Sequence, residues 1–244
     1  MNYYYITDTG KVRDHNEDSV LIVENGSREC LMAVADGMGG HNAGEVASSI
    51  AISHIGERFR KLDTIGTKED AQNWLRDVVS EINVLIFKYT ETHPESKGMG
   101  TTLVTAIVTK DFLIYGNIGD SSGFAVKNGK MYKITVDHTL VNLLVKNGEL
   151  TEEEAKNHPR KNVITRAIGT NSNVDVDVFK VDRHEYKAYL LCTDGLSNDV
   201  DEDEIWKKVI KSNDFDKACN ELVEMAKARG GKDNITVVVF GGEK

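Results

Sequence analysis

The sequence has no long hydrophobic run. No stretch approaches the roughly 20 consecutive apolar residues that a membrane-spanning helix needs. The chain opens with Met1-Asn2-Tyr3-Tyr4-Tyr5, which lacks the basic and then apolar layout of a signal peptide. We therefore expect a soluble protein that works in the cytoplasm and has no membrane partner.

Cysteine and proline are scarce. The three cysteines, Cys30, Cys192 and Cys219, are far apart, and each lies among apolar neighbours. This pattern favours buried thiols in a reducing compartment over disulfide bonds or zinc ligation. The chain has only two prolines and no proline-rich linker, and its 244 residues can form one large domain with its own core. We expect a single domain over residues 1–244.

Positive charge is also in deficit. The chain has 30 Lys and Arg against 39 Asp and Glu, which gives a formal net charge of −9. Because no basic cluster offsets this balance, nucleic acid is not expected as a partner. An anionic substrate would meet the same repulsion unless bound dications inverted the local field.

Four short acidic motifs stand beside apolar, strand-like runs. Taken singly, each is better explained as a turn in which the aspartate bonds its own backbone. Three of them, however, lie at the ends of probable core strands, so oxygen ligands from distant segments can meet. This repetition favours a divalent-cation site suited to magnesium or manganese. The motifs are Asn16-Glu17-Asp18, Asp36-Gly37, Asp194-Gly195 and Asp233-Asn234.

Hydrophobic periodicity predicts an α+β fold. Helices are expected near 43–62, 69–91, 202–211 and 215–228, the first opened by Asn42 with Glu45 and the second by a Thr67–Asp70 capping box. Helical pairs near both ends of a strand-rich chain predict two mainly antiparallel sheets, face to face, with helices outside. Strands are expected near 3–8, 19–24, 29–35, 101–108, 112–119, 122–126, 131–136, 174–181, 187–193 and 235–240.

Residues 139–170 interrupt the strand pattern. One short helix ends at Asn147-Gly148, and Thr151 with Glu154 caps a second that stops before Pro159. A polar helical insertion of this length between strands is typical of a lid or flap.

Six motifs, in this order, resemble the metal-dependent protein phosphatases of type 2C, the PPM family, in their compact bacterial form. The resemblance extends over nearly the whole chain and is far more specific than one Asp-Gly pair. The motifs are residues 9–18, 35–41, 98–102, 116–121, 192–197 and 232–236.

The resemblance implies a four-layer α-β-β-α sandwich with a flap subdomain at about 139–170. It implies hydrolysis of phosphoserine and phosphothreonine in proteins, in signalling that opposes a eukaryotic-like Ser/Thr kinase. The implied cofactors are two Mn²⁺ or Mg²⁺ ions and a third, weaker ion. Asp36 would bridge two ions, with Gly37 (carbonyl), Asp194 and Asp233 as further ligands, Glu17 and Asp18 acting through waters, and Asp120 holding the third ion.

The chemistry follows from the residues. Paired dications can generate hydroxide from water near neutral pH, so no nucleophilic side chain is needed, and the chain has no Cys-x5-Arg segment. Arg13, four residues before Glu17, can clamp the other phosphate oxygens with its planar fork. The alternative for Arg13 is a surface ion pair with Asp14 or Glu17.

The chain departs from the family pattern at several positions. Met38 stands where many relatives have a histidine proposed as general acid, so the leaving group must take its proton from a water on the ions or from His41. Ser122 and Asn198 replace an arginine and an aspartate that relatives often carry. Asp120 has a second explanation as a structural hairpin residue.

Two other functions compete with a protein phosphatase. A metal-dependent phosphodiesterase or nuclease fits poorly with the acidic balance. A catalytically inactive or weak phosphopeptide-binding module predicts the loss of Asp36, Asp194 or Asp233, and all three are present. No exposed apolar helix face calls for a partner, so we expect a monomer.

Overall fold

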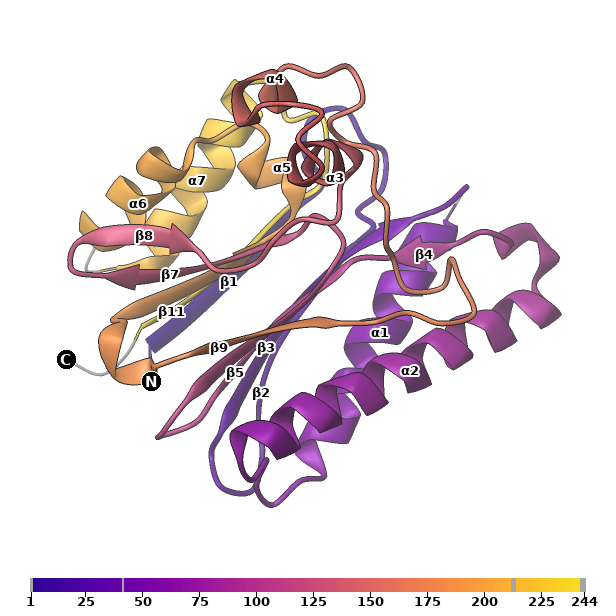
Figure 1. Ribbon diagram of the computed structural model, residues 1–244, viewed down its shortest axis with the longest axis horizontal. Helices are drawn as coiled ribbons and strands as arrows, with labels where there is room; N and C mark the ends of the chain where they lie inside the picture. The colour runs from indigo at the N-terminus through magenta and orange to yellow at the C-terminus, as the bar shows by residue number, and fades with distance from the viewer. Residues whose placement is uncertain (1, 41, 212–213, 242–244) are drawn as a thin grey trace.

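Two antiparallel sheets lie face to face in the computed structural model, which describes residues 2–40, 42–211 and 214–241 (Figure 1). One sheet has the order β2-β3-β5-β6-β9, with β4 paired to β3, and the other has the order β1-β11-β10-β7-β8. The strands are β1 Asn2–Asp8, β2 Asp18–Glu24, β3 Cys30–Met38, β4 Gly100–Thr101, β5 Leu103–Val108, β6 Leu113–Ile118, β7 Ser122–Lys127, β8 Lys130–Lys133, β9 Asp177–Val181, β10 Ala188–Cys192 and β11 Ile235–Gly241.

Helices cover the outer face of each sheet. The long pair α1 (Ala43–Arg60) and α2 (Lys68–Thr92) packs on the six-stranded sheet, and α6 (Glu202–Lys211) and α7 (Phe215–Ala228) pack on the other. Buried apolar side chains fill three layers: one under each helical pair and one between the sheets. The predicted α-β-β-α sandwich is therefore confirmed. Short helices complete the described chain: α3 Leu140–Lys146, α4 Glu152–Lys156, α5 Asp194–Ser197, η1 Pro94–Ser96 and η2 Arg183–Glu185.

The two long N-terminal helices begin differently. At α2 the predicted capping box is present, because Thr67 Oγ1 accepts from the Asp70 N–H at 3.2 Å and Asp70 Oδ2 accepts from the Thr67 N–H at 2.9 Å. At α1 the predicted pair is wrong, since the Asn42 side chain makes no capping bond. Asn42 has φ −93° and ψ 14°, outside the extended conformation in which an N-cap side chain reaches back over the first turn.

Strand β3 continues past the predicted end at residue 35. Asp36 pairs with Asp18 on β2, and Gly37 pairs with Thr101 on β4. The alternative interpretation of Asp36-Gly37 as a turn is therefore wrong, because both residues are paired within the sheet and the strand ends at Met38. The predicted strand 101–108 is divided at Thr102, whose N–H donates to the Asp36 carbonyl at 2.9 Å.

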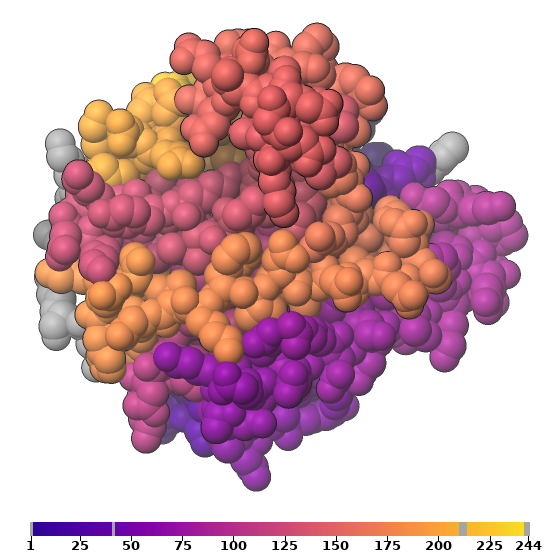
Figure 2. Space-filling view, viewed as in Figure 1, coloured from indigo at the N-terminus to yellow at the C-terminus, as the bar shows by residue number. Residues whose placement is uncertain are grey.

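The insertion between β8 and β9 stands at the top of the molecule beside α5 (Figure 1). It contains α3 and α4, and the predicted Thr151–Glu154 capping box is present. In the space-filling view this segment protrudes next to the C-terminal helices (Figure 2). Among the helices that the structure describes, none combines the length and the apolar character needed to cross a bilayer.

Candidate metal centre

Asp18 joins the two sheets at the centre of the site. It begins β2 and is buried, and its Oδ2 accepts from the hydroxyls of Thr193 at 2.9 Å and Thr236 at 2.6 Å. Both threonines belong to the other sheet: Thr193 directly follows β10, and Thr236 lies in β11. Asp18 Oδ1 is buried and has no hydrogen-bond partner, so one carboxylate oxygen remains available to a cation.

Asp36 lies directly across the ladder from Asp18, and its backbone is held on both sides. The Asp36 N–H donates to Thr102 Oγ1 at 2.9 Å, and Thr101 Oγ1 donates to the Asp36 carbonyl at 2.9 Å. These bonds fix a half-buried carboxylate within a strand, two residues before its end, rather than in a flexible loop.

Gly37 allows the start of α1 to approach this strand. A Cβ atom at Gly37 would lie 2.0 Å from the Gly44 carbonyl oxygen and 2.8 Å from the Glu17 carbonyl oxygen. The glycine is therefore required for close backbone packing, not for a turn as the sequence suggested. The packing brings Glu17, which is half-buried, to the same edge of the site.

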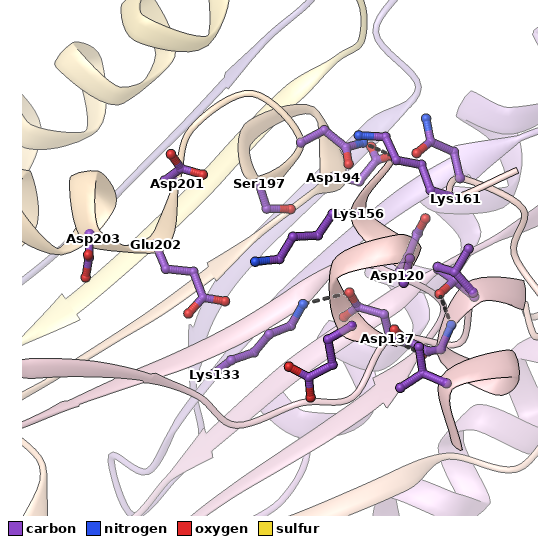
Figure 3. A pocket seen from close by; sticks show the side chains of 18 of the residues that line it. Asp120, Lys133, Asp137, Lys156, Lys161, Asp194, Ser197, Asp201, Glu202 and Asp203 are labelled. Carbon is purple, nitrogen blue, oxygen red and sulfur yellow. Dashed lines mark hydrogen bonds and ion pairs between the residues drawn. The ribbon is translucent and has the colours of Figure 1, made fainter. Parts of the chain in front are cut away.

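Asp194 approaches from the other sheet, and Asp120 from the connection between β6 and β7, which joins the two sheets. Asp194 is the first residue of α5, and its Oδ2 accepts from Asn198 Nδ2 at 2.9 Å. Asp120 follows β6 and is buried. In each side chain Oδ1 is buried and has no hydrogen-bond partner. Both line a cleft of about 1040 Å³ between the insertion and α6, whose walls also carry Lys156, Lys161 and Glu202 (Figure 3).

Asp233 lies before β11 and pairs with Arg13. Arg13 Nη2 is 2.8 Å from Asp233 Oδ2, and the Arg13 side chain is 48% exposed. The sequence left open an ion pair of Arg13 with Asp14 or Glu17, but the partner in the structure is Asp233. Its guanidinium stands at the rim of the carboxylate cluster and faces solvent.

Asn234 ties the N-terminal loop to this motif. Its Oδ1 accepts from the Glu17 N–H at 2.8 Å, and its Nδ2 donates to the carbonyls of Thr9 at 3.0 Å and His15 at 2.9 Å. The loop that carries Arg13 and Glu17 is therefore positioned by a residue more than 200 positions away.

The carboxylates perturb one another strongly. Burial, reinforced by Asp194 and Asp233 among others, raises the pKa of Asp18 to about 7. Burial and the nearby Asp194 raise the pKa of Asp120 to about 7, and burial with Asp233 raises that of Asp194 to about 6. The pKa of Asp36 is raised well above its ordinary value, first by burial and then by Asp18, Asp194 and Asp120. This mutual repulsion indicates that the four carboxylates lie near one another.

The donor chemistry fits hydrated hard cations. Among the described residues, no group of three or more Asp, Glu, His or Cys side chains is already arranged as a cation cage. Magnesium, however, keeps several waters and is usually bound by only one or two carboxylates per ion. Three unpartnered buried oxygens, on Asp18, Asp120 and Asp194, are the groups that such ions would satisfy.

Several functional contacts carried no readable sequence signal. The hydroxyls of Thr193 and Thr236 bond Asp18, and the amide of Asn234 bonds Glu17. These partners are so distant in the sequence that no local pattern indicates them. Asn198, noted as a departure from the family, holds Asp194. Ser122, the other substitution, contacts Asp137 Oδ1 at 3.3 Å. Of the two proton-donor positions discussed above, Met38 ends β3, and His41 lies outside the described residues.

Comparison with known proteins agrees with this geometry. The family profile described as Protein phosphatase 2C matches residues 10–237. The serine/threonine phosphatase stp of Listeria welshimeri is 39% identical over 239 residues, which cover 98% of this chain and 95% of that protein. The serine/threonine protein phosphatase PstP of Mycobacterium tuberculosis is 38% identical over 239 residues, which cover 98% of this chain and 44% of PstP.

Solved structures of other phosphatases resemble this chain over almost its full length. Serine/threonine phosphatase Stp1 from Staphylococcus aureus is 37% identical, with a TM-score of 0.93 over 99% of this chain and 95% of that one. The catalytic domain of PstP in complex with two manganese ions is 34% identical, with a TM-score of 0.84 over 98% of this chain and 96% of that one.

Proposed function

The chain belongs to the protein phosphatase 2C family and is a protein serine/threonine phosphatase, and from that premise we propose that it hydrolyses phosphoserine and phosphothreonine with the help of two Mn²⁺ or Mg²⁺ ions. One observation carries the proposal. Asp18, Asp36, Asp120, Asp194 and Asp233, from five separate segments, influence one another's charge, and three of them keep a buried oxygen that no protein group satisfies. The manganese pair reported for the PstP catalytic domain supports the same assignment.

The ligand set follows from the placement of the side chains. Asp36, Asp194 and Asp233 would hold the two ions together with the Gly37 carbonyl, and Glu17 and Asp18 would act through water. Asp120 would serve a third, weaker ion. When bound, the ions supply an activated water and neutralise charge on the phosphoryl oxygens.

Arg13 is proposed as the substrate clamp. Burial lowers its pKa, but Asp233 and other carboxylates outweigh this effect and raise it, so the guanidinium remains charged. Its planar fork can bond two phosphoryl oxygens at once. The half-exposed side chain stands at the rim of the cluster, where a phosphate group would arrive from solvent.

The leaving group must receive a proton from a group other than Met38, whose side chain has none to give. We assign this proton to water at the cluster, since bound dications acidify water. With cations bound, Asp18 would be deprotonated, because nearby positive charge favours the charged carboxylate.

The insertion 139–170 is proposed as a flap that contacts protein substrates. Its residues form one wall of the cleft that Asp120 and Asp194 line. The substrates would be phosphoproteins modified by a eukaryotic-like Ser/Thr kinase. Three buried free cysteines support a reducing, cytoplasmic location. The alternative of a phosphopeptide-binding module without catalysis predicts the loss of Asp36, Asp194 or Asp233, and all three are present.

Hydrolysis of a phosphothreonine peptide, with and without Mn²⁺ and a chelator, tests the proposal. We expect turnover with Mn²⁺ and its loss with chelator, restored by excess Mn²⁺. Turnover that resists exhaustive chelation refutes the two-ion mechanism. Binding of the peptide without any turnover at saturating Mn²⁺ favours the binding module.

A further inference from the structure

His138 occupies a position that the mechanism above does not use. It lies between β8 and α3 at the base of the insertion, and its side chain is only 9% exposed. Both of its ring nitrogens and both of its main-chain polar groups have partners, and these partners come from three different parts of the fold.

The loop that carries Asp120 is bonded twice by His138. The Gly119 N–H donates to His138 Nδ1 at 3.0 Å, and the His138 N–H donates to the Gly119 carbonyl at 2.8 Å. On the other side of Asp120, Ser121 Oγ is 2.8 Å from Thr102 Oγ1. Asp120 is therefore held between two fixed neighbours.

The tautomer of His138 follows from these contacts. A backbone N–H can only donate, so Nδ1 must present its lone pair to Gly119. The proton of the neutral ring is then on Nε2, which donates to Asp177 Oδ2 at 3.0 Å. Arg166 Nη1, 2.6 Å from Asp177 Oδ1, in turn orients that carboxylate.

The main chain of His138 also closes the base of the insertion. The Thr165 N–H donates to the His138 carbonyl at 2.8 Å, and Thr139 forms a β-bridge with Ile164. These bonds do not involve the imidazole. A side-chain substitution at His138 can therefore change the Gly119 contact and leave the base of the insertion connected.

We infer that His138 is a positioning residue for the phosphatase reaction: its Nδ1 lone pair fixes the Ile118–Gly119 peptide, directly before Asp120, and so aims the Asp120 carboxylate into the cleft. The Asp177–Arg166 pair acts behind it by fixing the ring orientation. The expected effect on catalytic activity rests on the proposed function. The placement of the Ile118–Gly119 peptide by His138 does not depend on that function.

Two amide substitutions separate this role from simple burial. In His138→Asn the side-chain oxygen stands near the former Nδ1 position and can still accept from Gly119, but the Asp177 contact is lost. In His138→Gln the longer side chain reaches Asp177 and leaves the Gly119 N–H without an acceptor. His138→Ala removes both contacts and sets the baseline.

The first readout is hydrogen exchange at the Gly119 amide, followed by NMR without added metal. We expect at least about tenfold faster exchange in His138→Ala and His138→Gln, and near-wild-type protection in His138→Asn, because exchange follows local opening. Equal protection in the Asn and Gln variants overturns the inference.

The second readout is steady-state hydrolysis of an aryl phosphate with saturating Mn²⁺. We expect kcat to fall at least about tenfold in the Ala and Gln variants with KM little changed, since small misplacements of reacting groups are costly. The Asn variant should recover most of the loss. Equal losses in Asn and Gln mean a purely structural role. If the wild type proves inactive, the proposed function fails, and the exchange experiment still decides the positioning.

Discussion

At the scale of single residues, the site is defined by carboxylate oxygens that the folded chain does not satisfy. Asp18, Asp120 and Asp194 each keep one buried oxygen without a partner. An unpaired buried charge is strongly unfavourable in a protein interior. Sites of this kind persist when a ligand of opposite charge compensates them, which here means bound cations.

Asp194→Asn should abolish most of the activity. The substitution keeps the size of the side chain but removes a negatively charged ligand. The positive charge of the two ions is then less fully neutralised, so they bind more weakly. We expect kcat/KM for an aryl phosphate to fall at least about 100-fold at fixed Mn²⁺, because ion loss affects both water activation and charge neutralisation. Asp111→Asn, an exposed hairpin substitution, is the matched control and should stay within twofold of wild type. Similar rates in both variants would remove Asp194 from the site.

Asp120→Asn should stabilise the metal-free protein at high pH. An aspartate whose pKa rises from 3.8 to about 7 on folding favours the folded state most below pH 4. This contribution is lost as the pH rises through about 7. At about 1.36 kcal/mol per pKa unit, the loss reaches at most about 4 kcal/mol.

Urea unfolding in chelator at pH 5 and pH 8 measures this effect. The stability of the variant relative to wild type should increase between the two pH values. Groups that do not interact with Asp120 cancel in the difference, and the relief of Asp36, whose pKa Asp120 helps to raise, acts in the same direction. A difference that does not depend on pH would show that Asp120 is not forced to carry an uncompensated charge.

At the scale of elements, β3 and the start of α1 place the central carboxylate. Gly37→Ala would put a Cβ atom 2.0 Å from the Gly44 carbonyl oxygen, so the helix must move away from the strand. We expect a loss of about 3 kcal/mol in unfolding free energy, as for overpacked cores, and weaker Mn²⁺ binding. Gly40→Ala is the control, since nothing lies within 4 Å of its added Cβ. Equal stability of the two variants in urea titration would contradict this packing.

The insertion makes a prediction about substrate size. Deleting residues 140–160 should reduce turnover of a phosphoprotein more than turnover of an aryl phosphate, because only the larger substrate can contact the second wall of the cleft. Parallel kcat/KM measurements on both substrates decide the matter. Proportionate losses would make the segment structural.

Much of this architecture was predictable because it depends on local pattern. Thr67 and Thr151 cap their helices as the spacing to Asp70 and Glu154 indicates, and Asn128 and Gly129 both have positive φ in the β7–β8 turn, as an Asn-Gly hairpin requires. These features involve residues at most a few positions apart. The buried faces of α1 and α2 likewise follow from a 3.6-residue period.

The parts that sequence reasoning missed depend on distant partners. Thr236 donates to Asp18 across 218 positions, and Asn234 receives the Glu17 N–H across 217. No local period or turn rule carries such contacts. The extension of β3 through Asp36 was missed for the same reason, since its partners on β2 and β4 exist only in the folded sheet.

At the scale of the whole molecule, the sandwich places acidic side chains from both sheets at the same end of the interface between the sheets. Asp18 and Asp36 come from the six-stranded sheet, whereas Asp194 and Asp233 flank strands of the other. The hydroxyl bonds from Thr193 and Thr236 to Asp18 connect the two sheets at this point. The arrangement predicts that cation binding and docking of the two sheets stabilise each other.

Calorimetric titration of Mn²⁺ into the chelator-treated protein, in wild type and Asp36→Asn, tests the central claim most directly. Asp36 is the proposed bridge, so its loss should weaken both sites together. We predict two strong sites per chain in wild type and neither at comparable affinity in Asp36→Asn. A wild-type protein that takes up no Mn²⁺, or a variant that still takes up two ions with unchanged affinity, would contradict the account.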